Sequence, residues 1–180
     1  MPSQDNRPSG ANRPLRARRI ALLSIFLAYA LVVGLIERMI PLGALIPGVP
    51  GIRLGLANIV ILVALYIFPM AESFMLMLLK SVLTSLLAGS PVSMFYSITG
   101  SVLAFLGMLL LIRLFKERVS PIGVSVAGAA LHNTGQILAA GMLMQTTVVF
   151  ALLPYLLLVA VTTGTLTGFA GKMVLKRWLR

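Results

Sequence analysis

The stretch Gly128-Ala129-Ala130-Leu131-His132-Asn133-Thr134-Gly135-Gln136 stands in the middle of an otherwise apolar run and contains the only histidine of the chain. If this run crosses a lipid bilayer, His132, Asn133 and Gln136 lie deep in the hydrocarbon layer. A polar group at that depth needs a hydrogen-bond partner or a wet cavity. The stretch therefore predicts a membrane bundle that has either hydrogen bonds between its helices or a polar cavity.

Composition places the chain among integral membrane proteins. Of its 180 residues, 59% are hydrophobic and 11% are charged, and the mean hydropathy is +1.02, which is more apolar than a soluble domain requires. The formal charge of +11 is carried at segment ends rather than in a stripe with exposed aromatic residues, which argues against nucleic-acid binding. With no cysteine, the chain cannot form disulfides or thiolate metal sites.

Six apolar segments predict an all-α membrane protein, a bundle of six transmembrane helices. Proline and glycine mark several of the breaks, at Pro69, at Gly89-Ser90-Pro91 and at Pro121. Residues 1–17 are expected to form a disordered basic tail in the cytoplasm, and residues 18–180 a single transmembrane domain. The predicted spans cover residues 19–39, 54–68, 71–88, 93–114, 121–144 and 149–174.

The distribution of lysine and arginine predicts the orientation. With the N-terminus inside, twelve of the fifteen basic residues lie on the cytoplasmic side. This asymmetry predicts a multi-pass protein of the inner (cytoplasmic) membrane with both termini in the cytoplasm and an even number of spans. The twelve residues are Arg7, Arg13, Arg16, Arg18, Arg19, Arg113, Lys116, Arg118, Lys172, Lys176, Arg177 and Arg180.

Topology does not explain the three remaining cations, Arg38, Arg53 and Lys80. Arg38 and Arg53 bracket a first external loop, residues 40–52, which has three prolines, three glycines and no charge. This composition predicts an ordered apolar flap that either closes the outer end of the bundle or covers a ligand as a lid. Lys80 lies near the middle of the third segment, where a lysine costs roughly 3 kcal/mol unless it faces a partner such as Glu37, a bound anion or a wet cavity.

The polar residues of the fifth segment favour a cavity. His132 and Gln136 are four residues apart and share a helix face, while Asn133 is rotated from His132 by about 100°. Hydrogen bonds between helices would explain one such residue, but three polar residues in five positions, with Lys80 elsewhere in the membrane, favour a cavity. His132 does not predict a metal site, because no cysteine and no nearby carboxylate could complete one.

Catalytic chemistry is not expected. The chain has four acidic residues, Asp5, Glu37, Glu72 and Glu117, and no two of them are placed for general acid/base work or for holding magnesium. It has neither a Walker A loop nor a Gly-x-Ser-x-Gly nucleophile elbow. We therefore expect a protein that is not an enzyme and that needs no metal or other cofactor.

Besides its short spans and its Pro/Gly-rich first loop, the chain contains two motifs that point to a known family. These are Arg53-Leu54-Gly55-Leu56-Ala57-Asn58-Ile59 and Ala130-Leu131-His132-Asn133-Thr134-Gly135-Gln136. Over residues 18–180 the chain resembles the substrate-binding S components of energy-coupling-factor (ECF) transporters, and most of all the Gx transporter family, also described as heptaprenyl diphosphate synthase component I. The resemblance implies a six-helix subunit that captures a small anionic or vitamin-like molecule from the outer face. It also implies a transmembrane coupling protein and cytoplasmic ATPases as partners.

The resemblance implies two sets of site residues. A partner interface is expected on the first helix, where Ala17-xxx-Ala21 and Ser24-xxx-Ala28 match the small-residue motif of the family and Ser24 departs from it; the same residues can instead serve packing inside the bundle. The ligand-facing set takes five residues from the two motifs, and the placement of Lys80 and Tyr96 adds two more. The set is Arg53, Asn58, Lys80, Tyr96, His132, Asn133 and Gln136.

The second name of the family leaves an alternative open. The chain could be a non-catalytic membrane partner of an isoprenoid (heptaprenyl diphosphate) synthase or of a membrane redox system. Direct catalysis is not expected, because trans-prenyl synthases hold their diphosphates through magnesium on Asp-rich motifs, and this chain has one aspartate, Asp5, in its tail.

Overall fold

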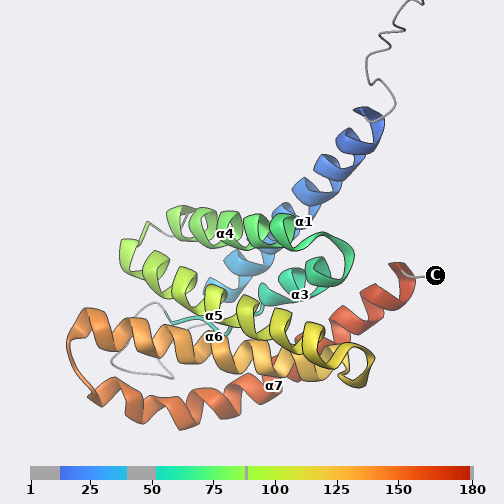
Figure 1. Cartoon of the computed structure of the whole chain (residues 1–180). Coiled ribbons are helices and arrows are strands. Elements are labelled where there is room, and N and C mark those ends of the chain that lie inside the picture. Colours follow the sequence, from blue (N-terminus) through green and yellow to red (C-terminus); the bar gives the residue numbers. More distant parts are fainter. Residues whose placement is uncertain (1–12, 40–51, 88, 179–180) are drawn as a thin grey trace, which may run out of the picture.

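Helices make up nearly all of the described chain, which comprises residues 13–39, 52–87 and 89–178 of the computed structural model (Figure 1). No strand occurs within these residues, which confirms the predicted all-α class. The predicted flap lies largely outside the described residues, since these omit residues 40–51. In chain order the elements are α1 (Arg13–Met39), α3 (Asn58–Ile67), α4 (Met70–Leu87), α5 (Pro91–Phe115), η2 (Lys116–Arg118), α6 (Pro121–Met144), η3 (Val148–Leu152) and α7 (Leu153–Trp178).

Two element boundaries differ from those that the sequence predicts. The predicted disordered tail covers residues 1–17, but helix α1 begins at Arg13, so residues 13–17 are helical. The second predicted span, residues 54–68, is helical only as the ten residues of α3, about 15 Å at 1.5 Å per residue. Residues 52–57 enter the bundle without regular structure, and Gly55 among them has φ +80°, a conformation that side chains disfavour.

Within the described residues, four helical stretches are long and apolar enough to cross a membrane: Arg16–Met39, Met70–Leu87, Pro91–Phe115 and Val148–Trp178. This finding supports a multi-pass membrane protein. Helix α3 is too short to cross a hydrocarbon core of about 30 Å by itself. Helix α6 has 24 residues and so has the necessary length, but it is not among the four stretches; it contains His132, Asn133 and Gln136. The count of six spans and the side of the membrane on which the termini lie stay predictions.

Helix α6 lies between α5 and α7 and packs along both (Figure 1). Glycines permit this close approach. A Cβ atom on Gly135 would lie 2.8 Å from the Cα atom of Gly100 in α5, and one on Gly164 of α7 would lie 2.6 Å from the Cα atom of Val126. Because its neighbours cover it on two sides, α6 can carry polar residues that a helix facing lipid could not.

Helix α1 packs against α3 and α4 and leaves its N-terminal part projecting from the bundle (Figure 1). Arg19 forms an ion pair with Glu72 at the start of α4, with 3.0 Å between Nε and Oε2. The ring of Phe26 contacts the rings of Phe68 and Trp178 edge-on, at centroid distances of 5.2 and 6.4 Å. These contacts connect α1 to the end of α3 and to the end of α7.

Candidate functional site

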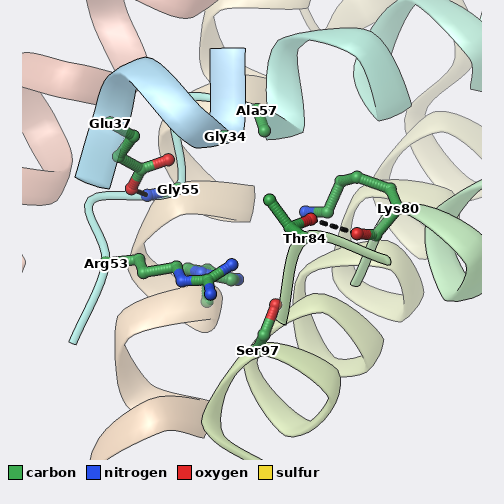
Figure 2. Close-up of a pocket in the computed structure, with 9 residues that line it drawn as sticks. Gly34, Glu37, Arg53, Gly55, Ala57, Lys80, Thr84 and Ser97 are labelled. Atoms are coloured by element: carbon green, nitrogen blue, oxygen red, sulfur yellow. Dashed lines mark hydrogen bonds between the residues drawn. The ribbon is translucent and has the colours of Figure 1, made fainter. Parts of the chain in front are cut away.

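A cluster of polar side chains is buried where α1, residues 52–57, α4, α5 and α6 meet (Figure 2). Glu37, Lys80 and His132 are 1–3% exposed and Arg53 is 8% exposed. A charged group in such a place is unfavourable unless it is paired or hydrogen-bonded. The partners of each side chain therefore indicate what the cluster can do.

Arg53 is fixed through both its main chain and its side chain. Its main-chain N–H and C=O groups are bound by the Gln136 amide, and its Nη2 atom donates a hydrogen bond to Ser93 Oγ at 2.8 Å. An arginine guanidinium stays protonated even when it is buried. The site therefore contains one permanent positive charge.

Lys80 connects α4 to two other elements. Its Nζ atom donates hydrogen bonds to Asn58 Oδ1 at the start of α3 (3.1 Å) and to Ser101 Oγ of α5 (3.3 Å). The hydroxyl of Thr84, one turn further along α4, donates to the main-chain oxygen of Lys80. Asn58 and Ser101 are neutral, so these contacts satisfy donors of the ammonium group without cancelling its charge.

Glu37 is the acidic member of the cluster. Its Oε1 atom accepts a hydrogen bond from the main-chain N–H group of Gly55. The positive φ of Gly55 and the closeness of His132 explain why glycine occupies this position: a Cβ atom there would lie 2.9 Å from His132 Cδ2. Glu37 thereby holds residues 52–57 against α1.

The cluster encloses a cavity of about 10 Å³, room for about one water molecule (Figure 2). Both ring nitrogens of His132, and Nδ2 of Asn58, are buried without a hydrogen-bond partner. Unpartnered nitrogens beside two cations make the cavity suited to a small oxygen-rich or anionic group. Its lining consists of Gly34, Glu37, Arg53, Gly55, Ala57, Lys80, Thr84, Ser97 and His132.

Three of the seven predicted ligand-facing residues line this cavity: Arg53, Lys80 and His132. Asn58 lies one contact away, as a hydrogen-bond acceptor of Lys80. The structure brings these four residues together, although they come from three different parts of the chain, and their contact with a ligand stays a prediction.

The other three predicted residues have surroundings that explain them without a ligand. Asn133 Nδ2 donates to the main-chain oxygen of Leu156 at 2.8 Å and so joins α6 to α7. Gln136 binds the main chain of Arg53. Tyr96, 2% exposed, packs in an apolar cluster with Ile52 and does not line the cavity.

The predicted set omitted several polar residues of the cluster. The sequence suggests Glu37 only as a partner of Lys80, and the predicted set does not include the serines of α5. Ser93, Ser97 and Ser101 recur every four residues, a spacing that places them on one helix face, and all three are buried. This spacing was the available signal. Among the described residues, no group of three histidine or acidic side chains could hold a metal ion.

The small residues of α1 lie away from this cluster. Ala17, Ala21, Ser24 and Ala28 are all exposed. They therefore do not pack inside the described bundle, and the other explanation for the stripe, contact with a second membrane protein, stays a prediction.

The family model for heptaprenyl diphosphate synthase component I matches residues 26–174, which includes every residue of the polar cluster. No curated protein and no solved structure matches the chain.

Proposed function

Since the chain belongs to the heptaprenyl diphosphate synthase component I family, we propose that it is a membrane-embedded binding subunit that works with partners and captures a small anionic molecule in its buried polar cluster. The word component in the family description supports a subunit role. The helices of membrane-spanning length support a location in the bilayer. In this proposal the protein lies in the inner (cytoplasmic) membrane, crosses it six times and has both termini in the cytoplasm.

The charge of the cavity is the observation on which the proposal depends. Two cations, Arg53 and Lys80, and one acid, Glu37, line it. Of the other acids in the chain, Glu72 pairs with Arg19, and Asp5 and Glu117 belong to the tail and to the segment after α5. Residues 40–52 contain no charged side chain. A monovalent anionic group would balance the excess positive charge in a place where an unbalanced charge is costly.

The size of the cavity limits what can enter it. A volume of about 10 Å³ admits a water-sized group rather than a whole vitamin. One oxygen atom of a carboxylate or of a similar compact anionic group would occupy the cavity itself, beside Lys80 and His132. The rest of a larger molecule would lie toward the outer end of the bundle, after a shift of α1 or of residues 52–57.

A ligand screen by thermal unfolding of the purified chain tests this proposal. The panel contains carboxylates, phosphates, flavins, quinone precursors and other vitamins, each beside a neutral analogue. At a hundredfold excess over its dissociation constant, a ligand adds about 2.7 kcal/mol to the free energy of unfolding. Anionic members should stabilise the chain, and Lys80→Met should abolish this effect while Lys172→Met, at an exposed position, should not. Equal stabilisation by the neutral analogues, or an unaffected Lys80→Met variant, would show that the cluster is purely structural.

The partners distinguish two versions of the proposed function. In the transport version, the exposed stripe of Ala17, Ala21, Ser24 and Ala28 contacts a transmembrane coupling protein that carries cytoplasmic ATPases. In the second version, which the family description favours, the chain is the membrane partner of a prenyl diphosphate synthase. Affinity purification from native membranes separates them: ATPases with a coupling protein support transport, and an Asp-rich prenyl synthase supports the second version.

A further inference from the structure

An apolar groove, which shares no lining residue with the polar cavity, runs between α1 and α7 and has α3 as its floor. Its volume is about 460 Å³, within the range of ligand-binding pockets. Ile25 and Tyr29 of α1, Val60 and Val63 of α3, and Val174 and Trp178 of α7 are among its lining residues. No charged side chain lines it.

The groove is an open trough rather than a closed cavity. Its floor is buried, with Val63 at 3% and Val60 at 8% exposure. Its rims are exposed, with Tyr29 at 65% and Trp178 at 46%. A trough of this kind suits a long apolar chain that enters sideways from the bilayer.

One end of the groove is basic. The start of α1 and the end of α7 lie on the same side of the molecule (Figure 1). Arg18 precedes the groove residue Leu22 by one helical turn on the same face, and Arg177 adjoins Trp178 in the last turn of α7. Both arginines are exposed, whereas the neighbouring Arg19 is paired with Glu72. By helix geometry, Arg16 and Lys176 point to other sides of their helices.

We infer that this groove binds a long-chain prenyl diphosphate, with the isoprenoid chain in the trough and the diphosphate on Arg18 and Arg177. Arginine binds phosphate oxygens through two parallel hydrogen bonds, which suits the two phosphate groups at the basic end. A single trough accommodates one chain, as a prenyl diphosphate has, rather than the two chains of a phospholipid. The inference rests on the second version of the proposed function, in which the chain serves a prenyl diphosphate synthase, and is independent of the polar cavity.

The position of Trp178 provides a direct test. It is the only tryptophan of the chain and it lines the groove, so its fluorescence reports on occupancy. The full-length protein in nanodiscs of phosphatidylcholine, which carries no net charge, is titrated with geranylgeranyl diphosphate. We expect a saturable change in emission. Geranylgeraniol, which lacks the head group, and inorganic diphosphate, which lacks the chain, should each bind at least about tenfold more weakly.

Matched variants locate the site. The pair Arg18→Gln with Arg177→Gln should weaken binding of geranylgeranyl diphosphate by about tenfold or more, because two charge-assisted contacts are lost. The pair Arg16→Gln with Lys176→Gln removes the same net charge and should change it by less than about twofold. In the trough, Val174→Phe should reduce binding, whereas Met173→Phe, at the adjacent exposed position, should not.

Three outcomes would overturn the inference. These are equal losses in the two charge pairs, binding of geranylgeraniol as tight as that of its diphosphate, and equal displacement by phosphatidylglycerol, which would make the groove a phospholipid site. Lys80→Met should leave binding of geranylgeranyl diphosphate unchanged. The experiments therefore distinguish three failures. The titration tests binding in the groove, the anion screen tests binding in the polar cavity, and the affinity purification tests whether a synthase is a partner.

Discussion

Gln136 of α6 and the main chain of Arg53 hold each other by two hydrogen bonds. The Arg53 N–H group donates to Gln136 Oε1 at 2.8 Å, and Gln136 Nε2 donates to the Arg53 carbonyl oxygen at 2.7 Å, across 83 residues of sequence. Arg53 belongs to no helix, so its main-chain groups need partners from elsewhere, and a membrane interior offers no water to supply them. The amide of Gln136 thus takes the place of a missing backbone neighbour.

The first prediction concerns this pair. Gln136→Leu keeps the size of the side chain but leaves the buried N–H and C=O groups of Arg53 without partners, which should lower the free energy of unfolding by about 2–4 kcal/mol. Thr134→Val is the matched control, since the Thr134 hydroxyl donates only to Ala130 of its own helix. Thermal unfolding in one fixed detergent measures both variants. Equal stability of the two would mean that residues 52–57 do not depend on α6.

The second prediction follows from the balance of charges around the cavity. Glu37→Gln leaves Arg53 and Lys80 buried with no acid beside them and should destabilise the fold by about 3–5 kcal/mol. Lys80→Met leaves one cation with one acid, so it should cost only about 1–2 kcal/mol, for the two lost hydrogen bonds to Asn58 and Ser101. Comparing the two unfolding temperatures checks the order. A Lys80→Met variant less stable than Glu37→Gln would contradict the proposed excess of positive charge.

The third prediction compares two glycines of α6. A Cβ atom on Gly135 would lie 2.8 Å from Gly100 Cα and 2.9 Å from the Thr99 carbonyl oxygen, and neither main-chain atom can move without shifting α5. Gly135→Ala should therefore destabilise by about 2–3 kcal/mol. At Gly123 the nearest atom belongs to the side chain of Val119 and lies at 3.4 Å, an ordinary contact distance, so Gly123→Ala should be neutral or stabilising by up to about 1 kcal/mol through helix propensity. The same sign for both substitutions would contradict the close packing of α5 on α6.

Much of the bundle could be predicted from sequence because hydropathy and helix breakers are local signals. Pro91 and Pro121 stand in the first turns of α5 and α6, and Ser90 and Ser120 cap them by accepting hydrogen bonds from the N–H groups three residues on. The length of helix α3 was harder to predict. Residues 54–57 are as apolar as α3 itself, and their departure from helix depends on the contacts of Glu37 with Gly55 and of Gln136 with Arg53, which hydropathy does not record.

Sequence could predict those residues of the candidate site whose burial in apolar surroundings has a high free-energy cost. An arginine, a lysine and a histidine in apolar surroundings are expensive, and all three line the cavity. Asn133 and Gln136 are expensive for the same reason, yet their hydrogen bonds go to Leu156 and to Arg53. Sequence shows that a polar group needs a partner, but whether that partner is a main chain or a ligand depends on which helices lie beside it.

The fourth prediction concerns the exposed stripe of α1. Ala21→Leu with Ala28→Leu should leave the unfolding temperature unchanged, because both positions face away from the bundle. The added bulk would prevent another helix from approaching closely, so recovery of a coupling protein with ATPases in affinity purification should fall sharply. Ala71→Leu with Ala151→Leu adds the same bulk at exposed sites outside α1 and should not reduce recovery. A double variant of α1 that keeps its partners would place the interface on another face. If instead it loses stability, the stripe contributes to the folding of the chain itself rather than to a partner interface.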